Sequence, residues 1–377
     1  MRRLVLLMLL AASCRKHESG FTLHGPVPAF SAALEQTTGV ALQPGHRLQL
    51  LDNGAVFDAL AADVGKAQRS INAETFIWTN GTASDRVLDA IKQRTEKGVI
   101  CRVLLDAVGS APLRDELIGK FAAARCQVRV FRPIPGPDNA ARNHRKVFVI
   151  DGRVGFTGGF GVDDKWLGDG LSKKNWRDTN VRVEGPAVAQ MQQSFAENWQ
   201  EPAGDFLPAS DFPRLEEVGP AKAAFVRSDA APVVTRAERL TQLAIAAARK
   251  RLWIENAYFA PSHAILDLLG RQAAAGVDVR MVVAGRKSDS KLEFLWAQTD
   301  YGELQKRGVR IWEYQASMIH SKTMLIDDSL LVIGSVNLEP FSLNKLEEGA
   351  IVAEDEGAAR KLATDFEEDC ARSKEQK

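Results

Sequence analysis

Long apolar runs and an excess of charge are both missing from this chain of 377 residues. A helix that crosses a bilayer needs about 20 consecutive apolar residues, and the apolar run near the start of the chain, Leu4–Leu10, is far shorter. No later stretch is long and apolar enough either, so we predict no membrane-spanning helix. The 49 basic and 48 acidic residues nearly cancel. This balance argues against a dedicated nucleic-acid-binding protein, which usually carries a strong basic excess.

Cysteine is also scarce, and its spacing excludes a zinc cluster. The four cysteines, Cys14, Cys101, Cys126 and Cys370, are scattered along the chain. No metal site and no cofactor is therefore predicted. Cys101 opens one predicted strand and Cys126 precedes another, so the two could pair in an oxidising compartment. Pairing depends on a geometry that a sequence does not contain, and the interpretation we favour is two unpaired core thiols.

The first 14 residues have the layout of a secretory signal. Arg2 and Arg3 precede the apolar run, and three small residues precede Cys14. This ending resembles the lipobox of bacterial lipoproteins, in which the cysteine is acylated after cleavage. We predict that residues 1–14 are a signal peptide with a lipobox, and that the mature protein is exported and anchored to a membrane surface of the cell envelope. An ordinary signal peptide and a misassigned start codon are the alternatives.

The rest of the chain reads as two similar halves. Residues 15–47 form a lead-in with Gly, Pro and Ser and no clear periodicity, and a Pro-rich stretch near residues 207–220 is the predicted linker. In residues 48–206 and again in 215–377, short strands alternate with amphipathic helices in the same order. Such alternation predicts an α/β fold in which helices cover a sheet.

The repeat is clearest in NHRKVFVIDGRVGFTGG of the first half and IHSKTMLIDDSLLVIGS of the second. Without any gap, His144, Lys146 and Asp151 align with His320, Lys322 and Asp327. Each segment predicts a hairpin with the aspartate at its turn. A buried histidine in an ordinary hairpin could explain one such motif, but hardly two with equal offsets among only six histidines. The other four, His17, His24, His46 and His263, lack a partner pattern and are predicted to lie on exposed segments.

Two histidines with two lysines suit the chemistry of a phosphodiester without a metal. Lysine ammonium groups stabilise the negative charge that gathers on the nonbridging oxygens in the transition state. One neutral imidazole can attack phosphorus and form a phosphohistidine. The other can protonate the leaving alkoxide and then activate the incoming alcohol or water. Neither half contains both histidines, so the sequence predicts one site between two halves.

These and neighbouring segments resemble a known family. RNHRKVFVIDG, FTGG, WRDTNVRVEGP, MIHSKTMLID and GSVNLEPFSLNKLEEG are together similar to the phospholipase D superfamily, in particular to its bacterial cardiolipin synthase-like branch. The likeness runs from about residue 48 to the C-terminus. It implies a duplicated αβα sandwich whose halves are related by a pseudo-twofold axis and share one active site.

The resemblance also implies roles for the motif residues. His144 resembles the nucleophile and His320 the general acid/base, although the symmetry of the sequence permits the roles to be exchanged. Lys146 and Lys322 would bind the phosphate.

Five further positions follow from the same resemblance. Asn337 is similar to an asparagine that contacts the phosphate, and Asp178 and Glu348 match carboxylates that orient the histidines. Asp151 and Asp327 complete the predicted catalytic motifs, but we expect them to brace the hairpins rather than to touch substrate.

Two departures from the family pattern bear on substrate rather than on reaction class. Gly161 stands where the second half has Asn337, and Leu346 replaces an asparagine common before the glutamate in cardiolipin synthases. Four other residues are predicted to be structural, Glu74 and Asp106 through hydrogen bonds and Trp176 and Trp253 through core packing.

The leading hypothesis is phosphatidyl transfer between glycerophospholipids, with phosphatidylglycerol as substrate and a membrane surface as the place of reaction. A phospholipase D that releases phosphatidic acid would use the same phosphohistidine, because water and alcohol compete for it. A phosphodiesterase acting on nucleic acid is disfavoured by the balanced charge and the predicted export. A non-catalytic lipid-binding relic is disfavoured because both motifs are intact.

Overall fold

The structure is a computed structural model that describes residues 19–111, 114–133, 141–202, 204–231 and 233–377. The predicted signal peptide and lipobox, with Cys14, lie outside these residues, and so does His17. Of the helices in the described ranges, none has the length and apolar character needed to cross a bilayer.

One series of elements occurs twice along the chain. In the first half the series is β1 (Gln43–Asp52), α3 (Ala55–Val64), β2 (Ser70–Thr75), α4 (Thr82–Thr95), β3 (Ile100–Asp106), α5 (Arg114–Ala123), β4 (Cys126–Phe131), β6 (Lys146–Ile150), β7 (Val154–Gly158), β8 (Thr179–Glu184) and α6 (Ala187–Gln200). In the second half it is β9 (Ala221–Ser228), α7 (Arg236–Ala247), β10 (Arg251–Asn256), α8 (His263–Ala274), β11 (Asp278–Ala284), α9 (Lys291–Lys306), β12 (Arg310–Tyr314), β13 (Lys322–Ile326), β14 (Leu330–Gly334), β15 (Leu346–Glu354) and α11 (Glu356–Ala371). Outside the series are α2 (Phe30–Thr38), β5 (Arg142–Asn143), the 3-10 helices η3 (Asp164–Trp166) and η4 (Ala209–Asp211), α10 (Pro340–Asn344) and β16 (Ser373–Glu375).

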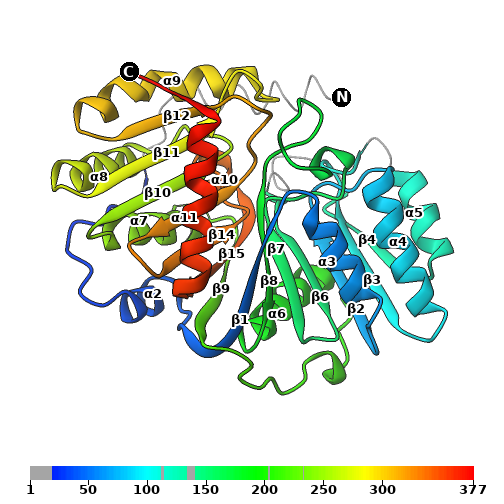
Figure 1. Cartoon of the computed structure of the whole chain (residues 1–377). Coiled ribbons are helices and arrows are strands. Elements are labelled where there is room, and N and C mark those ends of the chain that lie inside the picture. Colours follow the sequence, from blue (N-terminus) through cyan, green and yellow to red (C-terminus); the bar gives the residue numbers. More distant parts are fainter. Residues whose placement is uncertain (1–18, 112–113, 134–140, 203, 232) are drawn as a thin grey trace.

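The strands of both halves form one continuous mixed sheet (Figure 1). From its outer edge inwards the first half has the order β4-β3-β2-β6-β7-β8-β1. The second half has the matching order β12-β11-β10-β13-β14-β15-β9, with the short β16 added outside β12. The halves meet where β1 pairs antiparallel with β9. The strand order therefore confirms the predicted duplication.

Helices cover both faces of this sheet. Along β15, Ile351 and Ala353 belong to a core that also contains residues of α3, α4 and α11, whereas Ala350 and Val352 belong to a core with residues of α7, α8 and α9. Successive residues of a strand point to opposite faces, so β15 is buried on both sides. This arrangement confirms the αβα sandwich.

Capping residues set where several helices begin. The side chains of Thr235, Ser262 and Ser290 accept hydrogen bonds from backbone N–H groups in the first turns of α7, α8 and α9. The lead-in of residues 15–47 also contains a helix, α2, which ends at Gly39 in the left-handed conformation (φ 75°). Its short apolar face packs against α7.

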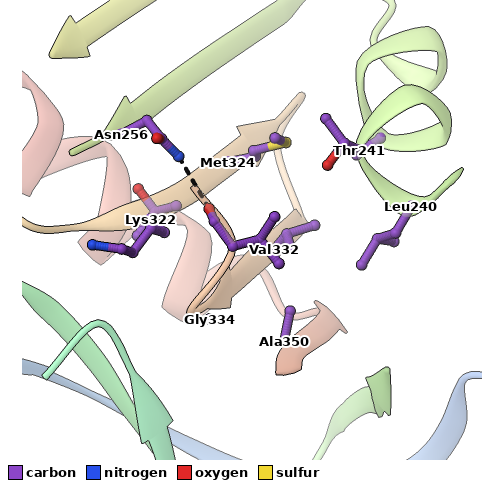
Figure 2. A pocket seen from close by; sticks show the side chains of 11 residues that line it. Leu240, Thr241, Asn256, Lys322, Met324, Val332, Gly334 and Ala350 are labelled. Atoms are coloured by element: carbon purple, nitrogen blue, oxygen red, sulfur yellow. Dashed lines mark hydrogen bonds between the residues drawn. The ribbon is translucent and has the colours of Figure 1, made fainter. Parts of the chain in front are cut away.

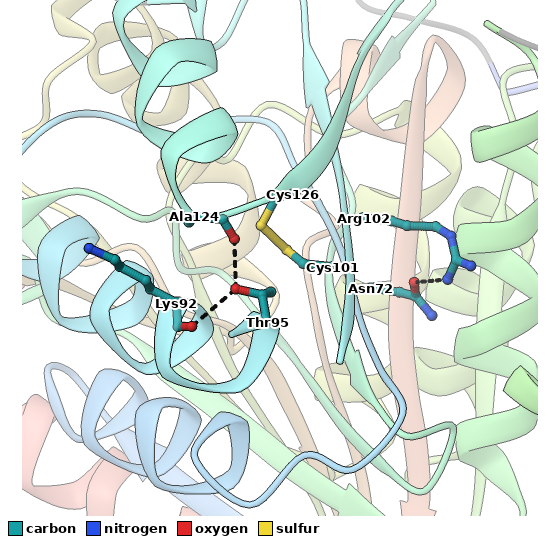
Figure 3. The surroundings of a disulfide bond; sticks show 7 residues. All are labelled: Asn72, Lys92, Thr95, Cys101, Arg102, Ala124 and Cys126. Carbon is teal, nitrogen blue, oxygen red and sulfur yellow. Dashed lines mark hydrogen bonds between the residues drawn. A yellow bond between two sulfur atoms is a disulfide. The ribbon is translucent and has the colours of Figure 1, made fainter. Parts of the chain in front are cut away.

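The prediction that Cys101 and Cys126 are unpaired is wrong. Parallel pairing of β3 with β4 places the two residues directly opposite each other, with their Cα atoms 4.6 Å apart, and they form a disulfide (Figure 3). Cys370, in contrast, is a free cysteine. The sequence did not reveal the pair because the register of two strands depends on how the whole sheet assembles.

The prediction that His46 is exposed is also wrong. Its side chain is fully buried beside the junction of β1 and β9, and its Nε2 accepts a hydrogen bond from the backbone N–H of Ala187 at the start of α6. Burial lowers the pKa of His46. His24 and His263 are exposed, as predicted.

Candidate active site

The site is built on two equivalent hairpins, β6–β7 and β13–β14. Asp151 and Asp327 lie at their turns in the left-handed conformation, with φ of 54° and 51°. The carboxylate of Asp151 accepts hydrogen bonds from the backbone N–H groups of residues 68–70, and that of Asp327 accepts from residues 249–251. Each aspartate thus ties its hairpin to the start of β2 or β10, which is the predicted bracing role.

The histidines and lysines lie at the opposite end of these hairpins. Lys146 and Lys322 are the first residues of β6 and β13, and His144 and His320 precede them by two positions. All four side chains are buried. The motif aspartates are therefore a full strand length away from the reactive groups.

Each histidine is held by backbone contacts from the other half. The N–H of His144 donates to the carbonyl of Glu347 at 2.9 Å, beside the short parallel pairing of β5 with β15. The N–H of His320 donates to the carbonyl of Arg177 at 2.6 Å, beside a bridge between Arg177 and Ile319. The segment before each motif therefore lies beside the residues of the other half that carry a carboxylate, Glu348 in β15 and Asp178 directly before β8.

The carboxylates consequently pair crosswise with the histidines. Nδ1 of His144 lies 2.9 Å from a carboxylate oxygen of Glu348, and Nδ1 of His320 lies 3.4 Å from one of Asp178. A carboxylate at Nδ1 fixes the orientation of the ring and favours the tautomer with the proton on Nδ1. Nε2 of each ring then remains for chemistry. The structure brings these four predicted residues together in two pairs, each made from both halves.

Three side chains that the sequence analysis missed hold these carboxylates. The indole N–H of Trp166 donates to Asp178 at 2.7 Å, and the hydroxyls of Ser335 and Ser342 donate to Glu348. Trp166 and Ser342 lie at the same distance along the chain after Gly158 and Gly334. Extending the alignment of the repeats past those glycines would have pointed to both positions.

The lysines place two positive charges inside the site. Nζ of Lys146 donates to the carbonyl of His144 at 2.6 Å, and Nζ of Lys322 donates to that of His320 at 2.5 Å. Within the described residues neither ammonium forms an ion pair. Burial, together with the charge of Lys322, lowers the pKa of Lys146 to about 7, and burial lowers that of Lys322 to about 8. An anion placed between them would stabilise the charged form of both lysines.

Burial lowers the pKa of His144 and lowers that of His320 still more. The charges of Lys322, Lys146 and His144 also lower the pKa of His320. Together with the crosswise contacts of His144 with Glu348 and of His320 with Asp178, this places groups from both halves at a common site. Burial raises the pKa of Asp178 to about 7.

Aromatic rings surround the two histidines unequally. The ring of Phe76 packs against His144, with ring centres 5.2 Å apart. Trp166, Trp176 and Tyr258 pack around His320 at 5.2, 5.1 and 6.1 Å. Trp176 is buried, as predicted, and so is Trp253, but Trp176 also forms part of the wall of the site.

The predicted phosphate contact of Asn337 stays a prediction. Its side chain is buried, and its amide oxygen has no hydrogen-bond partner among the described residues. Gly161, at the equivalent position of the first half, has little room for a side chain, because an added Cβ would lie 3.0 Å from Ile77 and 3.1 Å from the ring of Trp166. The ring of Trp166, which donates to Asp178, thus disfavours a side chain at position 161, where the second half has Asn337.

A small apolar cavity lies behind Lys322, between α7 and the strands β13, β14 and β15 (Figure 2). Its volume is about 20 Å³, roughly the space of one water molecule, so it does not accommodate a substrate. Two of its lining residues, Val332 and Ala350, occupy positions that the larger Phe156 and Asn180 occupy in the paired strands of the first half.

Glu74 and Asp106 have the structural role that was predicted. Glu74 accepts hydrogen bonds from Asn143 at 2.8 Å and Asn198 at 3.0 Å, and Asp106 accepts from Arg142 and from the backbone of Asn143. Both support the segment that leads to His144. No cluster of His, Cys, Asp or Glu suited to a metal ion is found in the part of the chain that the structure describes.

Comparison with known proteins identifies the family of this site. Residues 60–199 and 242–370 match the family described as cardiolipin synthase, PLD-like domain. The chain belongs to this family. As a member of the cardiolipin synthase family of phospholipase D-like proteins, it is an enzyme of the phosphatidyltransferase and phosphodiesterase type.

Relatives within the cardiolipin synthase family cover most of the chain. It is 31% identical over 341 residues to cardiolipin synthase 1 of Bacillus cereus. The aligned region covers 87% of this chain and 67% of the relative. It is 32% identical over 348 residues to cardiolipin synthase A of Pseudomonas aeruginosa, covering 91% and 71%. The chain spans 65% of cardiolipin synthase of Geobacillus kaustophilus, at 32% identity.

Solved structures outside the cardiolipin synthases share the fold. The crystal structure of phosphatidylserine synthase from Haemophilus influenzae Rd KW20 matches with a TM-score of 0.65 at 13% identity, over 92% of each chain. Polyphosphate kinase from Porphyromonas gingivalis matches with a TM-score of 0.56 at 13% identity, over 92% of this chain and 50% of that one. At such identities the likeness concerns the fold alone.

Proposed function

We propose that this enzyme transfers a phosphatidyl group from one glycerophospholipid to another, with phosphatidylglycerol as both donor and acceptor. The proposal is carried by the two crosswise pairs, His144 with Glu348 and His320 with Asp178, beside two buried lysines. The names of the three relatives described above, each a cardiolipin synthase, support the same substrate class.

The reaction then has two steps, formation of a phosphohistidine and transfer of the phosphatidyl group to the acceptor lipid. Nε2 of one histidine attacks phosphorus, the bond from phosphorus to the headgroup oxygen breaks, and the second histidine in its protonated form gives its proton to the released glycerol. In the second step that histidine takes the proton from a hydroxyl of the acceptor lipid. The hydroxyl oxygen attacks phosphorus, and the phosphorus–nitrogen bond breaks. Lys146 and Lys322 stabilise the charge on the nonbridging oxygens in both steps.

The site itself favours His144 for the first role. Its Nδ1 is the closer of the two to a carboxylate, and Glu348 is held in place by two hydroxyls. A firmly oriented, neutral ring is what a nucleophile requires. This agrees with the assignment that the family resemblance implies.

We further propose that the enzyme is exported and attached to a membrane surface through an acylated Cys14. The basic start, short apolar run and small residues before that cysteine support export. The disulfide between Cys101 and Cys126 is also in keeping with an oxidising compartment. An anchor would hold the enzyme beside its lipid substrates.

Lipid products test the reaction. Purified protein is incubated with vesicles that contain phosphatidylglycerol, with and without a chelator, and the products are separated and quantified. We expect cardiolipin and glycerol in equal amounts, unchanged by the chelator. Phosphatidic acid as the sole lipid product would show hydrolysis instead, and loss of activity with the chelator would contradict the metal-free mechanism.

Histidine variants provide the controls for that assay. His144→Ala and His320→Ala should each lower the rate by orders of magnitude. His263→Ala, on the exposed surface of α8, should not change it. For the anchor, mass spectrometry of the mature N-terminus should detect acyl groups on Cys14, and Cys14→Ser should abolish them. A mature protein without acyl groups would overturn the anchor.

A further inference from the structure

Two exposed segments beside the active site combine basic and apolar side chains. In residues 165–175, three lysines occur with one acidic residue, and in residues 286–295, three basic residues occur with two acidic ones. We call these two segments together the rim. The exposed basic residues of the rim are Lys165, Lys173, Lys174, Arg286, Lys287 and Lys291.

Both segments are attached to the stretch that leads into His320. The carbonyl of Gly170 accepts hydrogen bonds from the hydroxyls of Ser317, at 2.6 Å, and Tyr314, at 3.3 Å. Nζ of Lys287 donates to the carbonyl of Ala316 at 2.7 Å. The two segments, which come from different halves, therefore lie next to each other over residues 314–317.

The rim is also in direct contact with the walls of the site. Trp166 and Trp176, within and next to the first segment, pack against His320. The hydroxyl of Tyr258, whose ring also packs against His320, donates to Asp289 of the second segment at 2.7 Å. Any surface that the rim binds is thereby placed close to the aromatic rings that pack around His320.

Each segment exposes a leucine to solvent. Leu171 is 45% exposed and Leu295, in the first turns of α9 at the upper edge of Figure 1, is 56% exposed. Of the two acidic side chains exposed in the rim, Asp169 accepts a hydrogen bond from the backbone N–H of Leu171, and Asp289 is held by Tyr258. The lysines of residues 173 and 174 form no ion pair within the described residues.

We propose that the rim is the surface with which the enzyme docks on an anionic phospholipid bilayer. This inference rests on the proposed function, because it takes the substrate to be a lipid within a bilayer. The phosphodiester of such a lipid lies at the level of the headgroups, so the entrance to the site has to approach that level. Lysines attract anionic headgroups, and exposed leucines gain free energy by entering the boundary between headgroups and acyl chains.

Vesicle binding tests the proposal with the full chain carrying Cys14→Ser, so that no acyl group contributes. Binding is measured by sedimentation with vesicles of phosphatidylcholine alone or of equal parts phosphatidylcholine and phosphatidylglycerol. We expect binding to the mixed vesicles only, weakened by salt. The pair Lys173→Glu with Lys174→Glu, and the pair Leu171→Ser with Leu295→Ser, should each reduce the affinity about tenfold or more.

Matched controls come from the end of the sheet opposite the site. Ile100 begins β3 at that end and is 41% exposed, and Lys97 is exposed just before it. Ile100→Ser and Lys97→Glu should leave the affinity unchanged. The rim variants should also retain their rate on a short-chain phosphatidylglycerol that is present as monomers, because their active site is intact.

The outcomes separate the two proposals. Rim variants that bind mixed vesicles as tightly as the controls do would overturn the docking surface, and so would failure of the chain with Cys14→Ser to bind these vesicles at all. Binding that depends on the rim, without any conversion of lipid, would leave the docking surface in place and overturn the proposed reaction.

Discussion

The two histidine–carboxylate pairs differ at the level of single atoms. Glu348 lies 2.9 Å from its histidine and accepts from two serine hydroxyls, whereas an oxygen of Asp178 is shared between an indole N–H at 2.7 Å and His320 at 3.4 Å. The same chemistry is thus supported by different side chains in the two halves.

Neutralising either carboxylate should disable its histidine. In Glu348→Gln and Asp178→Asn the ring loses the negatively charged, acceptor-only partner that fixes its tautomer, so we expect kcat to fall by about a hundredfold or more with little change in KM. Glu347→Gln is the control, because this neighbouring side chain contacts Arg132 and Arg145 rather than a histidine. Rates on phosphatidylglycerol within tenfold of the unmodified enzyme for both variants would contradict the orienting role.

The lysines should impose an alkaline limit on activity. Their pKa values of about 7 and 8 in the free enzyme mean that the ammonium forms exist below those pH values and disappear as pH rises through them. We therefore expect kcat/KM to decline from about pH 7 to about pH 9. Lys322→Arg keeps its charge at all these pH values, so the variant should lose the part of the decline that belongs to Lys322. An unchanged pH profile in this variant would disprove the assignment.

At the scale of elements, each hairpin is fastened at one end and reactive at the other. Asp151 and Asp327 each accept hydrogen bonds from three consecutive backbone N–H groups at the start of a neighbouring strand. Their left-handed backbone conformation directs the side chain back to that strand. The motif aspartate therefore acts on the sheet, whereas the histidine and lysine of the same motif act on the substrate.

Replacing Asp151 or Asp327 should lower the stability of the protein rather than its catalytic rate. Asp151→Ala and Asp327→Ala leave three N–H groups without their charged acceptor, so we expect the free energy of unfolding to fall by about 2 to 3 kcal/mol. The exposed neighbour Asp328 pairs with Lys250, and Asp328→Ala should have a much smaller effect because solvent screens this pair. Urea denaturation measures these differences. A brace variant that is fully stable but has lost kcat would show that the aspartate takes part in the reaction.

At the scale of the whole molecule, two buried arginines of the first half bind acids of the second. Arg145 lies 3.5 Å from Glu347 and also pairs with Asp229, and Arg177 lies 2.6 Å from Asp369. A buried charge that loses its partner is costly, so these pairs disfavour separation of the halves. One hydrophobic core with residues from both halves acts in the same direction.

A site that one chain completes by itself should not be rescued by a second chain. Both histidines and both carboxylates come from a single polypeptide, so a mixture of His144→Ala and His320→Ala proteins should be no more active than the two measured separately. The assay measures cardiolipin formation. The control is the unmodified enzyme, diluted to the same protein concentration. Recovery of activity on mixing would mean that functional sites form between chains.

Residue identity and spacing alone determined much about this protein. The two motifs with equal offsets predicted the duplication, the hairpins and the reactive residues, because these features depend on positions close together in the chain. The alternation of strands and helices predicted an α/β fold with helices covering a sheet, and the family resemblance implied the duplicated αβα sandwich. Glu74 and Asp106 were correctly expected to serve as hydrogen-bond acceptors.

Only the tertiary structure decided how distant segments combine. Glu348 is 204 positions from His144, and Asp178 is 142 positions from His320, so their crosswise pairing depends on how two half-sheets join. The disulfide of Cys101 with Cys126 depends on strand register, and the burial of His46 depends on the junction of β1 with β9. In each case the decisive neighbour is brought in by packing and strand pairing over long stretches of chain, which no local pattern of residues specifies.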